Sequence, residues 1–215
     1  MESRATVFLV DDEPAVRDAV SLFLMSKGHV VELFDSAQAF LDAYQPDRPG
    51  CLVLDIRMPG MSGMELQEEL TRRQITIPII FISGHGDVPI AVKAFKAGAL
   101  DFLEKPFDNH KLLSCIEMAM QRDQERRRRQ TERTEMLSRY RQLTPREREV
   151  MVLVAEGKTN KDVARRLDIS HRTVEIHRRR VMEKLGAASV SDLVSVSVLC
   201  GVYELHVPNH QPVLE

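Results

Sequence analysis

Short apolar runs rich in β-branched residues alternate with longer amphipathic segments through the first half of the chain. Runs this apolar are typical of strands buried on both faces of a parallel sheet, and the segments between them are typical of helices that cover such a sheet. Residues 1–120 are therefore expected to form an α/β domain built on a doubly wound, five-stranded parallel sheet. The strands are expected at "TVFLV", "VVELF", "CLVLD", "PIIFIS" and "DFLE".

The next segment is strongly charged, and residues 121–135 contain no apolar residue. Opposite charges at helical i,i+4 spacing and the absence of Gly and Pro between Phe107 and Pro145 favour a solvent-exposed helix that continues from the first domain. A disordered charged linker is the alternative. We assign residues 121–142 to this linker. The spaced pairs are Asp123 with Arg127, Glu125 with Arg129 and Arg128 with Glu132.

Residues 143–202 have the pattern of several short helices, and residues 203–215 that of a flexible tail. Thr144, Pro145 and Glu147 make a capping box with proline at the first helical position. Residues 160–185 give two amphipathic helices joined by a short turn at residues 168–170, which is the pattern of a helix-turn-helix. A small all-α domain is therefore expected. Its apolar stripes are Val163, Ala164 and Leu167 on the first helix, and Val174, Val181 and Leu185 on the second.

Charge is distributed unevenly along the 215 residues, although the net charge is only −2. The first 120 residues hold 11 basic and 18 acidic side chains, and the remainder holds 19 and 14. A basic C-terminal part suits a polyanionic partner. No apolar stretch of about 18 residues suggests a membrane span, and three scattered cysteines suggest neither a disulfide framework nor a metal site, so a cytoplasmic protein is expected.

Chemically useful side chains follow the ends of four predicted strands: Asp11 and Asp12, Asp55, Ser83, and Lys105. Because the carboxyl ends of parallel strands meet at one edge of a sheet, these groups are expected to lie close together. Three converging carboxylates repel one another unless a cation joins them, and Mg²⁺ suits a site of carboxylate and phosphate oxygens. Lys105 and Ser83 can then contact phosphoryl oxygens while Asp55 attacks as a nucleophile.

The segments "VDDE", "LDIRMPGMSG", "ISGHGD" and "KAGALDFLEKPF" resemble the receiver domain of two-component response regulators. The resemblance implies a sheet in flavodoxin-like order, Asp55 as phospho-acceptor and Lys105 as phosphate-binding lysine. It also implies that Mg²⁺ is bound by Asp12 directly, by Asp11 through water, and by Asp55 and the backbone carbonyl of Arg57. Ser83 and Phe102 correspond to switch residues, with Phe102 replacing the tyrosine often found there. His85 is expected to be a loop residue.

The stretch from Leu143 to about residue 202 resembles the LuxR-type output domain, most closely that of FixJ-like response regulators. The resemblance implies that residues 170–185 form the helix that reads DNA, with Glu175, Ile176 and Arg179 at base-contact positions. The last helix, about residues 190–199, is a dimer face by the same resemblance, through Leu193, Val194 and Val198; these side chains can instead all be core. The expected DNA-binding residues are Arg172, Thr173, Glu175, Ile176, Arg178, Arg179 and Arg180.

Together these resemblances imply a transcription regulator controlled by phosphorylation. A sensor histidine kinase transfers a phosphoryl group to Asp55, the protein becomes a homodimer, binds double-stranded promoter DNA and recruits RNA polymerase. We do not expect the protein to be an enzyme. A phosphatase that uses Asp55 as nucleophile would need a second catalytic acid or base, and the strand-end loops do not offer one. The sequence is also compatible with a constitutive DNA-binding regulator that its receiver does not control, and with a C-terminal domain that binds only protein.

Overall fold

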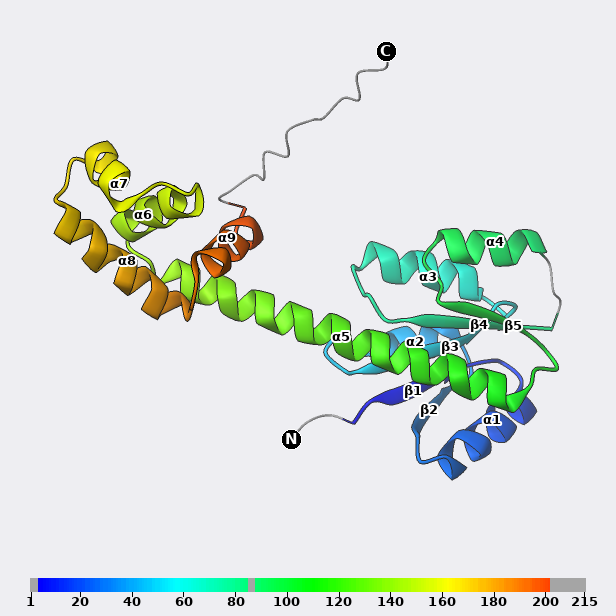
Figure 1. The fold of residues 1–215 in the computed structure, drawn as a ribbon. Coiled ribbons are helices and arrows are strands. Elements are labelled where there is room, and N and C mark those ends of the chain that lie inside the picture. Colours follow the sequence, from blue (N-terminus) through cyan, green and yellow to red (C-terminus); the bar gives the residue numbers. More distant parts are fainter. Residues whose placement is uncertain (1–3, 85–87, 202–215) are drawn as a thin grey trace, which may run out of the picture. The chain divides into compact units, whose positions relative to one another are not determined.

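The computed structural model describes residues 4–84 and 88–201. His85 and the predicted tail at residues 203–215 lie outside the described residues. The chain forms two compact units, the first ending at Arg127 and the second beginning at Arg128 (Figure 1).

The first unit is a parallel sheet with the strand order β2-β1-β3-β4-β5. The prediction of a doubly wound five-stranded sheet in flavodoxin-like order is confirmed. The strands are β1 (Thr6–Val10), β2 (Val30–Phe34), β3 (Gly50–Asp55), β4 (Ile79–Ser83) and β5 (Asp101–Glu104). The helices are α1 (Pro14–Ser26), α2 (Ala37–Ala43), α3 (Gly63–Arg72), α4 (Val88–Lys96) and α5 (Asn109–Arg141).

Both faces of this sheet are buried, as its apolar strands require. Successive side chains of β1 point to opposite faces, so Phe8 and Val10 join one core cluster while Val7 and Leu9 join the other. Helices α2, α3 and α4 supply the first cluster, and α1 and α5 supply the second. The sheet is therefore the middle layer of three, and its carboxyl edge is free to carry polar groups.

The register brings the four chemically useful strand ends to that one edge. Val10 is paired with Leu54, Asp55 with Ile82 and Ser83 with Glu104. Asp11 directly follows β1 and Lys105 directly follows β5. The expectation that these groups share an edge follows from the parallel pairing alone.

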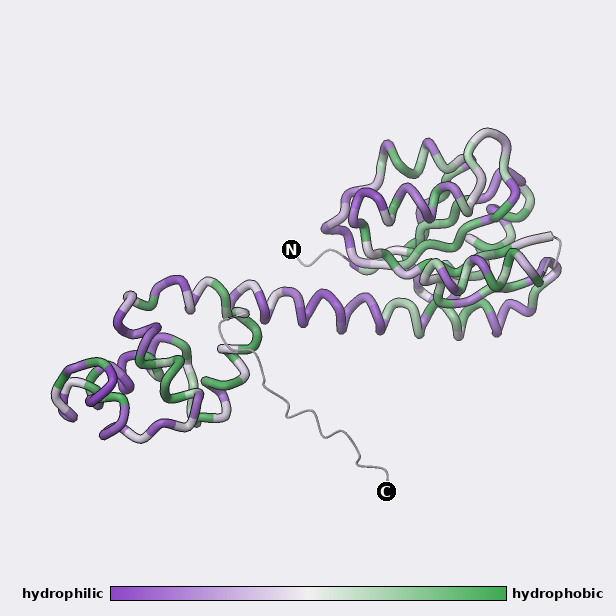
Figure 2. The backbone as a smooth tube through the Cα atoms, turned by 90° about the horizontal axis from the view of Figure 1, so that it is seen from above, coloured by the Kyte–Doolittle hydropathy of each residue, from purple (hydrophilic) through white to green (hydrophobic). Residues whose placement is uncertain are grey.

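Helix α5 continues through the charged segment, so the helical interpretation of the linker is confirmed. Figure 2 shows the mainly hydrophilic character of this stretch. The expectation that all of it is exposed is wrong, because Asp123 is only 1% exposed. Its carboxylate accepts hydrogen bonds from Gly50 N (3.0 Å) and from Arg127 Nε (2.7 Å). The buried charge is thus fully matched, and the first unit extends past Met120 to Arg127.

Arg127 also binds the loop before β3, because its guanidinium donates to the backbone carbonyls of Pro46, Asp47 and Arg48.

Replacing Asp123 with Ala leaves Gly50 N without its acceptor, and we expect this to lower the local stability of the β3 amino end by about 1–3 kcal/mol. Hydrogen exchange at the Gly50 amide measures this loss. The exposed Glu125 on the same helix is the matched control; equal exchange in Asp123→Ala and Glu125→Ala would contradict the prediction.

The second unit packs the last turns of α5 with α6 (Pro145–Ala155), α7 (Asn160–Leu167), α8 (His171–Leu185) and α9 (Val190–Leu199). Met136 and Tyr140 of α5 lie against a core that includes Val163, Val174 and Val181. The apolar stripes predicted for the helix-turn-helix are therefore confirmed. The predicted capping box is also present, since Thr144 and Glu147 each accept a hydrogen bond from the other's backbone amide.

Glu147, which is almost fully buried, joins the cap of α6 to α8 through an ion pair with the partly exposed Lys184. Its carboxylate is 2.6 Å from Lys184 Nζ and accepts from Thr144 N at 2.8 Å. Burial raises the pKa of Glu147, but the contacts with Lys184 and Thr144 outweigh it and hold the pKa below the ordinary value of 4.5.

A depressed pKa in the folded state gives stability that is present above the unfolded pKa and is lost as the pH falls below it. We therefore expect the second unit to lose stability as the pH falls from about 5 toward the lowered pKa of Glu147. Glu147→Gln should remove this part of the pH dependence. Amide exchange at the α6 amino end, followed against pH, measures it; an unchanged profile in Glu147→Gln would contradict the assignment.

Candidate functional site

The carboxyl edge of the sheet carries a buried polar site made by four strand ends. Asp11 is fully buried, Asp55 is 4% exposed and Ser83 is 2% exposed. Lys105 reaches this site from the end of β5, where its backbone amide donates to Ser83 O at 2.7 Å. Removing polar groups from water costs free energy, so such groups are buried only where they have hydrogen-bond or ionic partners or a ligand.

Lys105 links the two buried carboxylates. Its Nζ lies 2.7 Å from Asp11 Oδ2 and 3.1 Å from Asp55 Oδ1, and it also lies 3.2 Å from the exposed Glu13. Burial alone would lower the pKa of Lys105, but Asp11 and Asp55 together raise it above its ordinary value. The ammonium therefore stays charged and places a positive charge directly beside Asp55.

The Asp55 carboxylate is held at both oxygens. Oδ1 faces Lys105, and Oδ2 accepts a hydrogen bond from Arg57 N at 3.0 Å. Burial raises the pKa of Asp55 above its ordinary value, and the contact with Lys105 offsets part of this effect. An oriented carboxylate with one ammonium neighbour, at a strand end, is suited to attack an electrophile that arrives with its own negative charge.

Two residues near this site were not anticipated from the sequence. Arg17 on α1 donates to the Asp11 backbone carbonyl at 2.6 Å and fixes the end of β1. Gly63, at the start of α3, lies so close to Asp55 that a Cβ on it would come within 2.2 Å of the Asp55 carbonyl oxygen. Gly63 is the last residue of the motif "LDIRMPGMSG", but only the fold shows why a side chain is excluded at that position.

The three carboxylates expected to converge do not form one cluster in the described residues in this conformation. Within residues 4–84 and 88–201, no group of three His, Cys, Asp or Glu side chains is placed to hold a metal ion. Asp11 and Asp55 converge on Lys105, whose charge separates them, while Asp12 is only partly buried. The donors present are nevertheless carboxylate oxygens at one edge, and this hard donor set fits Mg²⁺.

Helix α8 presents several basic side chains on its outer face. Arg172, Glu175, Arg179 and Arg180 are exposed. Ile176 is partly buried, as is His177, whose Nδ1 has no hydrogen-bond partner. A helix whose apolar side is in the core and whose other side carries exposed arginines is able to bind phosphates and base edges.

Two of the predicted DNA-binding residues also make contacts within the domain. Arg178 donates to Asn160 Oδ1 at 3.0 Å and so ties α8 to the start of α7. Thr173 donates its backbone amide to the Ser170 hydroxyl at 3.0 Å, which caps α8. Neither side chain is fully exposed.

Comparison with known proteins follows the same division of the chain. Residues 7–117 match the response regulator receiver domain, and residues 141–197 match the bacterial regulatory proteins of the luxR family. The chain belongs to the response-regulator family. Response regulators of this composition are phosphorylation-dependent transcription regulators of two-component systems, and this is the function of the chain.

The similarity extends over nearly the whole response regulator. The transcriptional regulatory protein FixJ of Bradyrhizobium diazoefficiens is 43% identical over 94% of this chain and 98% of its own length. TodT of Pseudomonas putida is 44% identical over 92% of this chain and 87% of its own. The solved structure of the response regulator StyR is 45% identical with a TM-score of 0.83, covering 91% of this chain and 99% of that one.

The last helix of the response regulator divides the predicted dimer residues. Leu193 is fully buried in the core of the second unit, so its assignment to a dimer face is wrong. Val194 is partly buried, and Val198 and Leu199 are about 40% exposed. Only the outer side of α9 is available to a partner.

No helix in the described part of the chain has the length and apolarity to cross a membrane.

Proposed function

We propose that Asp55 is the residue that receives the phosphoryl group from a sensor histidine kinase. The observation that carries this proposal is the position of Lys105 Nζ, which lies 3.1 Å from Asp55 Oδ1 inside a buried edge of the sheet. A carboxylate buried with an ammonium neighbour and a buried hydroxyl, Ser83, has the parts that phosphoryl transfer requires.

In the transfer, an Asp55 oxygen forms a bond to phosphorus as the phosphorus–nitrogen bond of the kinase's phosphohistidine breaks. The imidazole nitrogen keeps the electron pair and takes a proton from solvent. Lys105 contacts a phosphoryl oxygen and the Ser83 hydroxyl donates to another, while the Arg57 amide holds Asp55 in position. Asp11, Asp12, Asp55 and the Arg57 carbonyl would hold Mg²⁺, which would supply further positive charge for the phosphoryl oxygens.

The phosphoryl group then biases an equilibrium between two receiver states. Before transfer, Lys105 is shared by Asp11 and Asp55; afterwards it has phosphoryl oxygens as partners. Ser83 is drawn toward the new group, and Phe102, which packs partly buried against the α2–α3–α4 core, changes its packing. The group shifts the equilibrium only by its different interaction with the two states.

The output is binding of double-stranded promoter DNA by α8 in the major groove, in the cytoplasm. Glu175, Ile176 and Arg179 contact base edges, and Arg172 and Arg180 contact phosphates. Phosphorylation favours a homodimer that presents two such helices through the outer side of α9, with Val194 and Val198, and the dimer recruits RNA polymerase. The exposure of the α8 arginines supports this assignment.

The proposal is tested by incubating the protein with acetyl phosphate, with Mg²⁺ or with a chelator, and measuring the intact mass. We expect one phosphoryl group per chain with Mg²⁺, and at least about tenfold slower incorporation with the chelator because the phosphoryl charge is then less well neutralised. Peptide mapping should place the group on Asp55. Modification at another residue, or equal rates in both conditions, would overturn the proposal.

A further inference from the structure

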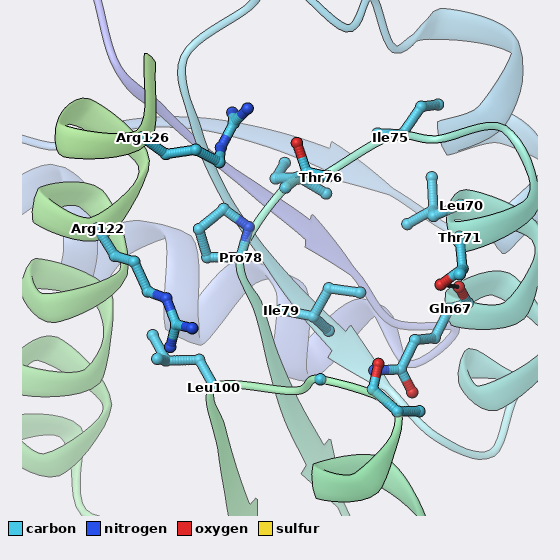
Figure 3. Close-up of a pocket in the computed structure, with 13 residues that line it drawn as sticks. Gln67, Leu70, Thr71, Ile75, Thr76, Pro78, Ile79, Leu100, Arg122 and Arg126 are labelled. Carbon is cyan, nitrogen blue, oxygen red and sulfur yellow. Dashed lines mark hydrogen bonds between the residues drawn. The ribbon is translucent and has the colours of Figure 1, made fainter. Parts of the chain in front are cut away.

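A cavity lies at the edge of the receiver sheet opposite the one that carries Asp55. It has a volume of about 260 Å³ and is bounded by α3, the amino ends of β4 and β5, and α5. Figure 3 shows Arg122 and Arg126 extending from α5 on one side, and Gln67, Leu70 and Thr71 on α3 at the other. A cavity of this size is sufficient for a small molecule and too small for a nucleotide.

The charge of the cavity is one-sided. Arg122 and Arg126 are one helical turn apart on α5, and no acidic side chain is found among the described residues that line the cavity. Arg126 donates a hydrogen bond from Nη2 to Asp123, but its Nε is buried and has no hydrogen-bond partner. This side of the cavity therefore favours an anion.

The far side offers an acceptor. Gln67 is 2% exposed, and its amide nitrogen donates to Ala97 O at 3.1 Å, but its Oε1 is buried and has no hydrogen-bond partner. Leaving a buried acceptor unpaired is costly, and a donor brought there by a ligand removes that cost. Apolar side chains, among them Ile79 and Leu100, also line the cavity.

We propose that this cavity binds a small organic acid with a carboxylate at one end, an apolar body and a hydrogen-bond donor at the other. The carboxylate pairs with Arg122 and Arg126, the body lies on Ile79 and Leu100, and the donor turns toward Gln67. The site does not depend on Asp55, because it is formed at the amino ends of the strands. It is built by turns of α5 that precede the unit boundary at Arg127.

The probe is trans-4-hydroxycyclohexanecarboxylate, titrated into the full-length protein and followed by amide NMR shifts at Gly98 and Leu100, which line the cavity. We expect saturating shifts with a dissociation constant on the order of 1 mM, as suits so small a ligand. The matching carboxamide should bind at least about tenfold more weakly, because it cannot form charge-assisted hydrogen bonds. Cyclohexanecarboxylate, without the hydroxyl donor, should bind several-fold more weakly.

Arg122→Gln should weaken binding of the probe by at least about tenfold. Arg122 is exposed, so this variant keeps its fold, which unchanged amide shifts away from the cavity will establish. Arg128→Gln is the matched control, since Arg128 lies on the same helix, is exposed and does not line the cavity. Absence of saturating shifts, equal binding of the carboxamide or of the ligand lacking the hydroxyl, or equal binding by Arg122→Gln would each overturn the proposal.

Discussion

Replacing Asp55 with Asn is expected to lower the rate of phosphoryl incorporation by at least about 10³-fold, because the amide removes the attacking carboxylate oxygen. The substitution preserves size and the hydrogen bond from Arg57 N, so the receiver should stay folded. It also relieves the repulsion between two buried carboxylates that share Lys105. The loss should therefore appear in the chemistry and leave stability nearly unchanged.

Asp47→Asn is the matched control for this experiment. It is the same chemical change at an exposed loop position whose side chain is not part of the site. Intact mass after incubation with acetyl phosphate and Mg²⁺ should show normal incorporation in Asp47→Asn and none in Asp55→Asn. Incorporation into Asp55→Asn at the normal rate would show that the acceptor is another residue.

Replacing Arg179 with Ala should weaken binding to a specific duplex by about 10-fold to 100-fold, the range expected when one contact to a base edge is lost. Arg179 is 70% exposed on α8, and its 3.8 Å approach to Glu183 is too loose to hold it away from DNA. Its removal should leave the core contacts of Val174 and Val181 intact.

Arg128→Ala serves as the control, because it removes an equally exposed arginine from α5. Both variants should be measured at the same salt concentration, since nonspecific phosphate binding changes steeply with salt. A dissociation constant for Arg179→Ala within twofold of that for Arg128→Ala would remove Arg179 from the DNA-reading surface.

Most of the fold follows from local patterns of the sequence. The five strands are apolar runs of the right length, and their parallel pairing alone brings Asp11, Asp55, Ser83 and Lys105 to one edge. The α6 cap was predictable because Thr144 and Glu147 are three residues apart and act on each other's backbone. Signals of this kind are contained within one turn or one strand.

The failures concern contacts between residues far apart in the chain. Asp123 lies in a segment that reads as solvated, yet its buried acceptor role depends on Gly50, 73 residues away. Leu193 sits on a helix that is apolar on several sides, and only its packing separates core from surface. Arg178 donates to Asn160 on the preceding helix, a contact that the sequence does not reveal. The local sequence pattern does not identify partners that lie far away in the chain.

The arrangement of Asp11 and Asp55 around Lys105 has an electrostatic reason. From the sequence, three carboxylates at one edge call for a cation, and a metal ion is the usual one. Lys105 meets that need for Asp11 and Asp55 with a charge that the chain itself provides. Because Lys105 already lies beside Asp55, it is placed to contact the negative oxygens that phosphorylation of Asp55 would add.

Selection from a pool of random duplexes tests most directly whether phosphorylation of Asp55 controls DNA binding. The full-length protein and Asp55→Asn are each incubated with Mg²⁺, with and without acetyl phosphate, and the bound duplexes are sequenced. We predict enrichment of a sequence with two half-sites only when both Asp55 and the phosphodonor are present. Equal enrichment of one sequence in all four samples would contradict phosphorylation control and leave a constitutive DNA-binding regulator whose receiver does not control it.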